Sequence, residues 1–161
     1  MKTINAIKTG ITLPLIVLGL QVGNAAADEL FQGKELSLSL FGSYVDKDDS
    51  DVAPGAGISY FFTKHLGIGA FTHWENFDGT FIDNLSGEGH FRLPLDRLNL
   101  APYALAAYGY SFETEESFGA VGLGVEWRAN EKWGFFGDVR WQMNDDTDDG
   151  VGIRLGARLV F

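Results

Sequence analysis

The sequence contains no cysteine among its 161 residues. This absence excludes a disulfide framework, thiol redox chemistry, a cysteine-ligated zinc site and a lipid-modified N-terminal cysteine. Basic residues are also scarce, because 12 Lys and Arg stand against 22 Asp and Glu and leave a formal net charge of −10. Without a basic patch, a protein has little with which to replace the counterions of a polyanion. The composition therefore argues against nucleic-acid binding.

Long apolar runs are absent too, apart from one near the N-terminus. Two lysines precede the apolar run Ile11–Leu20, and Ala25–Ala27 supplies the small side chains typical of a signal-peptide cleavage site. The run has about half of the roughly 20 residues that a membrane-spanning helix needs, which argues against an uncut anchor. We therefore expect residues 1–27 to be a signal peptide and residues 28–161 to form the exported domain.

Glycine and aromatic residues, by contrast, are abundant, with 21 Gly, 13 Phe, 5 Tyr and 4 Trp. From Glu35 onward, apolar residues alternate with small, polar or charged ones in eight successive segments. Over residues 120–128, for example, the odd positions hold Val, Leu, Val and Trp, and the even positions hold Ala, Gly, Gly, Glu and Arg. A period of two is the signature of a β-strand with two different faces. The fifth segment, Leu100–Phe112, is too uniformly apolar for its faces to be assigned.

Segments of about ten residues with one apolar and one polar face fit a transmembrane barrel. The glycines on the polar face suit the crowded interior of a narrow barrel better than a surface in water. Aromatic residues gather at the ends of the apolar faces, as in the interfacial girdles of membrane barrels: Tyr44, Phe62, Trp74, Trp127, Trp133, Trp141 and Phe161. We therefore predict an all-β fold, an eight-stranded antiparallel transmembrane up-and-down β-barrel. A soluble periplasmic barrel, with its apolar face inward, is the alternative.

The connections between the predicted strands differ in length on the two sides of the barrel. The three connections on one side are short, at 63–65, 94–99 and 129–132, which is typical of periplasmic turns. On the other side, three connections are longer, at 46–52, 76–84 and 144–150, and the fourth, at 113–117, is short. The connections on the other side form the predicted external rim, and their only base is Lys47. They carry 13 acids: Asp46, Asp48, Asp49, Asp51, Asp78, Asp83, Glu113, Glu115, Glu116, Asp145, Asp146, Asp148 and Asp149.

Three features carry a resemblance to a known family: the exported N-terminus, the segment Leu100–Tyr110, and the closing segment Gly156–Phe161. In these features the chain resembles the small outer-membrane β-barrel proteins of Gram-negative bacteria, the group that contains the membrane domains of outer-membrane proteins A and X. The resemblance implies a porin-like barrel domain in the outer membrane, surrounded by lipid and lipopolysaccharide. It also implies that Phe161 is part of the signal read by the barrel-assembly machinery.

Ten charged residues fall on the predicted inward face. An eight-stranded barrel is just wide enough for side chains to fill it, so these charges are expected to pair with one another. Glu35 is expected to approach Arg158, because closure pairs the first strand with the last. The network could serve a structural role or a gating role. Its members are Glu35, Glu75, Glu88, Arg92, Glu126, Arg128, Asp138, Arg140, Arg154 and Arg158.

One set of inward residues is reminiscent of hydrolase machinery. A hairpin centred between residues 80 and 81 places His73 opposite Glu88, and Glu75 opposite Ser86. A histidine, two carboxylates and a serine are the groups that activate a nucleophile. These groups point inward, however, away from the acyl chains that a lipid A-modifying barrel enzyme must reach. We therefore predict no catalytic residues.

The segment after residue 144 imitates the start of a calcium-binding loop. The twelfth position counted from Asp145 is Gly156 instead of glutamate, so there is no EF-hand. Asp145 and Asp149 are left as candidates for weak divalent-cation binding, and no cofactor is expected.

The sequence predicts a monomeric, non-enzymatic barrel with an envelope-stabilising or surface-interaction role. A narrow ion channel and a lipid A-modifying enzyme are the alternatives.

Overall fold

The computed structural model describes residues 30–46, 52–74, 82–112, 114–144 and 149–161. The predicted signal peptide lies outside this part of the chain. The described residues form eight strands and one short 3₁₀ helix, η1. In chain order the elements are β1 (Glu35–Asp46), β2 (Val52–Phe61), β3 (Leu66–His73), β4 (Asn84–Arg92), η1 (Asp96–Leu98), β5 (Leu100–Ser111), β6 (Glu116–Arg128), β7 (Trp133–Asn144) and β8 (Gly150–Val160).

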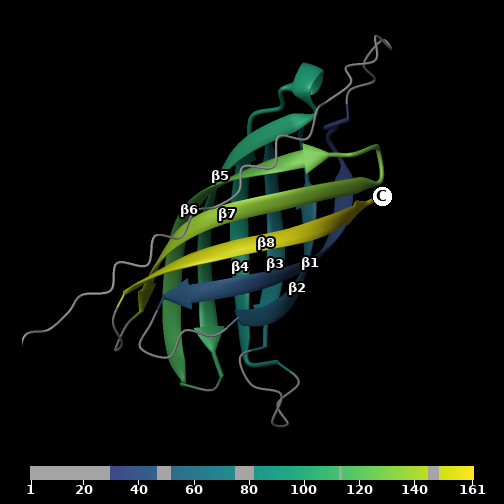
Figure 1. Ribbon diagram of the computed structural model, residues 1–161. Coiled ribbons are helices and arrows are strands. Elements are labelled where there is room, and N and C mark those ends of the chain that lie inside the picture. The colour runs from purple at the N-terminus through teal and green to yellow at the C-terminus, as the bar shows by residue number, and fades with distance from the viewer. Residues whose placement is uncertain (1–29, 47–51, 75–81, 113, 145–148) are drawn as a thin grey trace, which may run out of the picture.

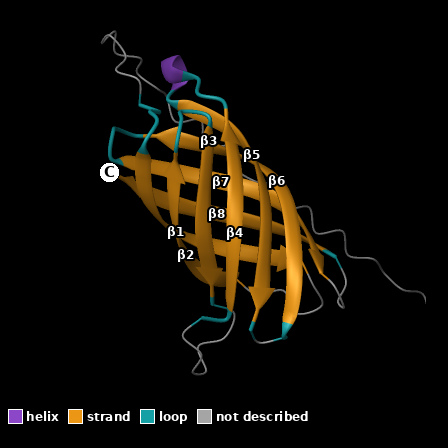
Figure 2. Cartoon of the chain, turned by 180° about the vertical axis from the view of Figure 1, so that it is seen from behind, coloured by secondary structure: helices purple, strands orange, loops and turns teal. Residues whose placement is uncertain are grey.

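Each strand pairs antiparallel with its neighbours in the sequence, and β8 pairs with β1 to close the barrel (Figures 1 and 2). Closure satisfies the backbone hydrogen bonds of the first and last strands, which would otherwise form exposed edges. The predicted fold, an eight-stranded antiparallel up-and-down barrel, is confirmed. Among the residues described here, no helix has the length and apolar character that a membrane span requires.

The two ends of the barrel differ and are named here by their connections. The turn end holds the start of β1, the end of β8 and the connections β2–β3, β4–β5 and β6–β7. The loop end holds the other four connections. In Figure 1 the C-terminus and η1 lie toward the same end, as an even number of up-and-down strands requires.

The apolar face of the barrel points outward. In β1, Leu36, Leu38 and Leu40 are exposed, whereas the intervening Ser37 and Ser39 are buried. This alternation continues through the other strands, where exposed aliphatic and aromatic side chains surround buried polar and charged ones. The arrangement is the opposite of the one that the soluble alternative requires.

The structure assigns the faces of the fifth strand, which the sequence left open. Tyr103 and Leu105 of β5 are buried inside the barrel, and Tyr108 and Tyr110 are exposed on its outer surface. Tyr103 and Leu105 join three phenylalanines in a buried cluster at the middle of the interior, made of Phe41, Phe71, Tyr103, Leu105 and Phe136. Both faces of β5 are apolar because one faces this cluster and the other faces outward.

The register of β3 against β4 differs from the predicted one. Glu88 lies opposite Gly69 instead of His73, and Ser86 lies opposite Phe71. The predicted hairpin centre was therefore wrong, although the described side chains of β3 and β4 kept their predicted faces. A strand has a side-chain period of two, so an even shift in register moves residues along the barrel without turning them over.

Candidate functional site

The most elaborate polar structure in the described residues is the charged interior of the barrel. Nine of the ten charged residues predicted to face inward are described, and all nine are buried. The tenth, Glu75, lies outside the described residues. The nine separate into two groups. The loop-side cluster contains Glu88, Asp138, Arg140 and Arg154, and the turn-side cluster contains Glu35, Arg92, Glu126, Arg128 and Arg158.

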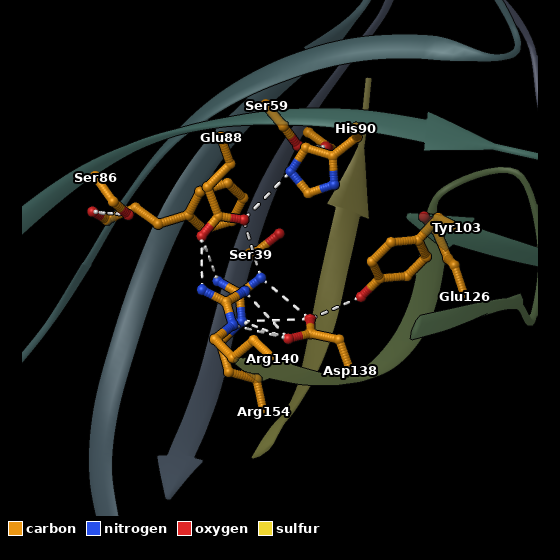
Figure 3. A network of polar contacts seen from close by, with 12 residues as sticks. Ser39, Ser59, Ser86, Glu88, His90, Tyr103, Glu126, Asp138, Arg140 and Arg154 are labelled. Carbon is orange, nitrogen blue, oxygen red and sulfur yellow. Dashed lines mark hydrogen bonds and ion pairs between the residues drawn. The ribbon is translucent and has the colours of Figure 1, made fainter. Parts of the chain in front are cut away.

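In the loop-side cluster, each arginine contacts both carboxylates (Figure 3). Nη1 of Arg154 lies 3.0 Å from Oε1 of Glu88, and its Nη2 lies 3.1 Å from Oδ2 of Asp138. Arg140 makes the equivalent contacts at 3.0 and 3.1 Å. The hydroxyl of Tyr103 donates a hydrogen bond of 2.8 Å to Asp138. Two positive and two negative charges thus form a closed, neutral set, the arrangement that buried ions require.

His90 borders the loop-side cluster. Its Nε2 lies 3.4 Å from Oε2 of Glu88 (Figure 3). Its ring packs among those of Phe61, Phe71 and Tyr103, with centroid distances of 6.1, 5.8 and 5.8 Å. The imidazole therefore fills space between the aromatic cluster and the ion pairs.

In the turn-side cluster, two carboxylates are shared among three arginines. Oε2 of Glu35 accepts hydrogen bonds from Nη2 of Arg92 at 2.7 Å and Nη2 of Arg128 at 3.0 Å. Glu126 accepts a hydrogen bond from Nε of Arg128 and one of 2.5 Å from Nη1 of Arg158. The cluster has three cations and two anions, so its stability depends strongly on each carboxylate.

The expected approach of Glu35 to Arg158 is wrong. Arg158 lies opposite Ser39 in the β1–β8 pairing, and its Nε donates a hydrogen bond of 3.2 Å to the serine hydroxyl. The pairing of β1 with β8 runs from Ser37, and Leu36 is hydrogen-bonded to Phe161 just beyond it, so Glu35 lies past the end of the chain's last strand. The strands of a barrel are staggered, and here the stagger carries Glu35 toward Arg92 and Arg128 instead.

Aromatic rings occupy the interior between the two clusters. The guanidinium carbon of Arg154 lies 5.0 Å from the ring centroid of Phe41 and 4.9 Å from that of Phe71. The guanidinium carbon of Arg158, from the turn-side cluster, lies 5.1 Å from the centroid of Phe136, and that of Arg154 lies 5.9 Å from the same centroid. Arginines at these distances gain cation–π attraction as well as ion pairing. The interior is therefore a packed core of charges and rings.

A small cavity opens on the loop side of this core. Its volume is about 20 Å³, which is room for a water molecule. Ser43, Ser86, Glu88, Arg140 and Gln142 contribute polar groups to its lining. The cavity is too small for an organic substrate.

The segment before β1 closes the turn end of the interior. Phe31 is completely buried, with its ring centroid 5.2 Å from the guanidinium carbon of Arg92 and 5.0 Å from that of Arg128. The carbonyl of Gln32 accepts a hydrogen bond of 2.8 Å from Nη2 of Arg92, and the amide of Gln32 donates one of 2.6 Å to Glu35. Sequence reasoning missed this contact, because a single phenylalanine ahead of the alternating pattern carries no periodic signal.

Replacing Phe31 with alanine is expected to loosen this segment and leave the barrel folded. A desolvated cation–π contact is worth about 2 kcal/mol, so the two contacts of this buried ring together contribute about 4 kcal/mol. Hydrogen exchange at the amides of Gln32 and Lys34 should accelerate at least about tenfold. Phe31→Leu keeps the apolar volume without the aromatic face and should give an intermediate rate. Unchanged exchange in both variants would show that the ring does not hold the segment.

The hydrolase-like set is described only in part, because Glu75 lies outside the described residues. The backbone of His73 pairs with the side-chain amide of Asn84, whose Oδ1 accepts at 3.1 Å and whose Nδ2 donates at 3.0 Å. Glu88, the predicted partner of His73, is occupied by Arg140 and Arg154. The four-residue difference in register places Glu88 opposite Gly69 instead of His73, and His73, Ser86 and Glu88 all line the small cavity.

The acidic rim is described only in part. Glu115 and Asp149 are exposed and Glu116 is half-buried, whereas Asp83, also predicted for the rim, is buried. Oδ2 of Asp149 accepts a hydrogen bond of 3.3 Å from the indole of Trp141. Asp145, the other candidate metal ligand, lies outside the described residues. Within the described ranges, no three His, Cys, Asp or Glu side chains are grouped to hold a metal ion.

Phe161, the predicted assembly signal, lies at the seam where the barrel closes. Its amide donates a hydrogen bond of 2.8 Å to the carbonyl of Leu36, and its side chain is exposed on the outer surface. The terminal aromatic ring is therefore accessible from outside the barrel.

No protein-family model matches the sequence, and no curated protein matches it either. Solved structures do match the fold. The N-terminal β-barrel domain of Pseudomonas aeruginosa OprF aligns with a TM-score of 0.61 and 14% identity, over 81% of this chain and 99% of that one. The outer membrane protein OprG from the same organism gives a TM-score of 0.55 and 12% identity, over 83% and 99%.

A transmembrane β-barrel designed de novo is also similar, with a TM-score of 0.60 and 17% identity over 81% of this chain and 98% of that one. At such low identity, the likeness establishes a shared fold. This chain therefore has the fold of the small eight-stranded transmembrane β-barrels, which includes the outer-membrane barrels of OprF and OprG.

Proposed function

We propose that this protein is a non-enzymatic barrel of the Gram-negative outer membrane with an envelope-stabilising or surface-interaction role. The observation that carries the proposal is the apolar outer surface. Leu40, Leu123 and Leu155, from three different strands, are 69%, 71% and 67% exposed. Apolar surface of this extent is unfavourable in water at about 25 cal/mol per Å², and surrounding lipid removes that cost.

Aromatic residues near both ends of the strands support the same placement. Phe62, Trp133 and Phe161 are exposed at the turn end, and Tyr110 and Trp141 are exposed toward the loop end. Aromatic side chains favour the boundary between hydrocarbon and headgroups, and membrane barrels carry a girdle of them at each interface. The two sets bracket the apolar band as such girdles do.

The polar interior supports a structural role over a catalytic one. Its carboxylates and guanidinium groups are engaged with one another, as the loop-side cluster illustrates. A lipid A-modifying enzyme needs its reactive groups on the lipid-facing surface. Mass spectrometry of lipid A from cells with and without the protein should show identical acylation, and a changed acylation pattern would contradict the proposal.

The envelope role has a direct test in cells. Deleting the gene should increase uptake of a hydrophobic dye or sensitivity to detergent, and expression of the intact chain should reverse the change. A surface-interaction role should instead reduce binding of the cells to a partner surface. A deletion strain with normal permeability and normal surface binding would contradict both forms of the proposal.

The charged interior suggests an alternative function, a narrow ion channel. We expect no stepwise conductance in planar bilayers, because ion pairs and the rings of Phe41, Phe71 and Phe136 fill the interior. The comparison is the Arg154→Glu variant, which reverses one charge of the loop-side cluster. Conductance steps in the wild-type protein that disappear in this variant would favour the channel.

A further inference from the structure

The turn end of the barrel carries four basic side chains, one from the segment before β1 and three from different connections. Lys34 precedes β1, Lys64 lies between β2 and β3, Arg97 lies in η1 between β4 and β5, and Lys132 lies between β6 and β7. Lys34, Arg97 and Lys132 are exposed and Lys64 is half-buried. These four side chains are called the basic ring below.

The closed topology spaces the basic ring evenly. Successive members are separated by two strands in a barrel of eight, so the four positions fall at about quarter turns around the rim. Figure 2 shows the turn-end connections distributed around that end of the barrel. An even distribution presents positive charge on all sides of the barrel, instead of in one patch suited to a compact partner.

Among the described residues of the turn end, the charge of the basic ring exceeds that of the acids in the connections. Asp96 and Glu131 are the acidic side chains of the described turn-end connections, so four positive charges stand against two negative ones. Glu35 and Glu126 also lie toward this end, but both are buried and paired with arginines. The described connections of the loop end carry exposed acids, Glu115 and Asp149, and no Lys or Arg. The barrel is therefore electrically asymmetric along its axis.

The ring also lies at a defined depth, because aromatic residues flank it in the chain. Trp133 directly follows Lys132, and Phe62 lies two residues before Lys64. Both aromatic side chains are exposed on the outer surface. Since such residues mark the boundary between hydrocarbon and headgroups, the adjacent lysines reach the layer of lipid phosphates.

We infer that the basic ring binds the headgroups of anionic phospholipids in the membrane leaflet that surrounds the turn end. This inference rests on the proposed membrane location and adds a lipid preference and a sidedness to it. Clusters of Lys and Arg at a membrane surface attract anionic lipids, and the attraction is screened by salt. The acidic loop end has the opposite charge and lacks this preference.

The tryptophans allow the lipid composition to be measured separately at each end. Trp127 and Trp133 lie toward the turn end, and Trp74 and Trp141 lie toward the loop end. The double variant Trp74→Phe/Trp141→Phe leaves turn-end reporters, and Trp127→Phe/Trp133→Phe leaves loop-end reporters. Each is reconstituted in vesicles with an equal small fraction of brominated phosphatidylglycerol or brominated phosphatidylcholine, and quenching of fluorescence is recorded.

At the turn end, brominated phosphatidylglycerol should quench more strongly than brominated phosphatidylcholine, corresponding to about two- to fivefold local enrichment. The enrichment should disappear at high salt and when all four ring residues are replaced by glutamine. Replacing Asp96 with Asn and Glu131 with Gln should increase it. The loop-end reporters should show no preference for the anionic lipid.

Three results would overturn the inference: equal quenching by the two lipids at the turn end, the same preference at both ends, or a preference that survives in the four-glutamine variant. Unboiled and boiled gel samples confirm that each variant is folded. Failure of the proposed function is a different result, because neither brominated lipid would then quench any reporter. That outcome would overturn the membrane location and the inference with it.

Discussion

Replacing Glu126 with glutamine is expected to lower the free energy of unfolding by about 3–5 kcal/mol, the usual cost of breaking a buried ion pair from one side. Glu126 is buried and contacts both Arg128 and Arg158. Its loss leaves the three arginines of the turn-side cluster with Glu35 as their one remaining carboxylate. Urea unfolding in lipid vesicles, followed by tryptophan fluorescence, measures the change.

The matched control is Glu131→Gln, which removes the same charge from an exposed position at the same end of the barrel. This variant should leave the free energy of unfolding unchanged, because an exposed carboxylate loses little when it is neutralised. Adding Arg158→Met to Glu126→Gln should recover part of the loss, since it removes one of the unpaired cations. Equal stabilities for the Glu126 and Glu131 variants would contradict the account of the cluster.

Replacing Gly156 with alanine is expected to destabilise the barrel by about 1–3 kcal/mol or prevent folding, because the interior has no room for a methyl group. A Cβ atom at this position would lie 2.5 Å from the carbonyl oxygen of Leu40 and 2.6 Å from Cβ of Phe41. Both residues belong to β1, which pairs with β8 at the closing seam. Because one of the clashing atoms is backbone, relief requires the two strands to move apart.

Gly87→Ala is the control for this substitution. The added Cβ would meet only the carbonyl oxygen of Tyr108, at 4.0 Å, and would point to the outer surface. Alanine loses less backbone entropy than glycine on folding, so this variant should be as stable as the wild-type protein or gain up to about 1 kcal/mol. If the two alanine variants unfold at the same urea concentration, the close contact of β8 with β1 is not a determinant of stability.

The strand faces could be predicted because lipid and interior select different residues. A period of two separates the exposed leucines of β1 from its buried serines, whichever residues they pair with across the sheet. The signal failed at β5, where an aromatic interior and an apolar exterior select similar side chains. Register could not be predicted for β3 and β4, because every even shift satisfies the same pattern.

The same pattern predicted which charged residues face the interior, but it did not predict which of them pair with one another. Glu35 approaches Arg92 and Arg128, which lie 57 and 93 residues away in the chain. Such partners depend on the stagger of the barrel and on the reach of long side chains across it, and neither is encoded in the spacing of one strand. Phe31 escaped prediction for a related reason, since its contacts depend on where those arginines lie.

The most direct test of the central claim, a closed barrel embedded in the outer membrane, is fractionation of expressing cells followed by gel electrophoresis with and without boiling. The account predicts that the protein is found in the outer-membrane fraction and that its mobility changes only after boiling, because the closed ladder of strands resists detergent. Recovery from the soluble periplasmic fraction, with the same mobility before and after boiling, would contradict the account.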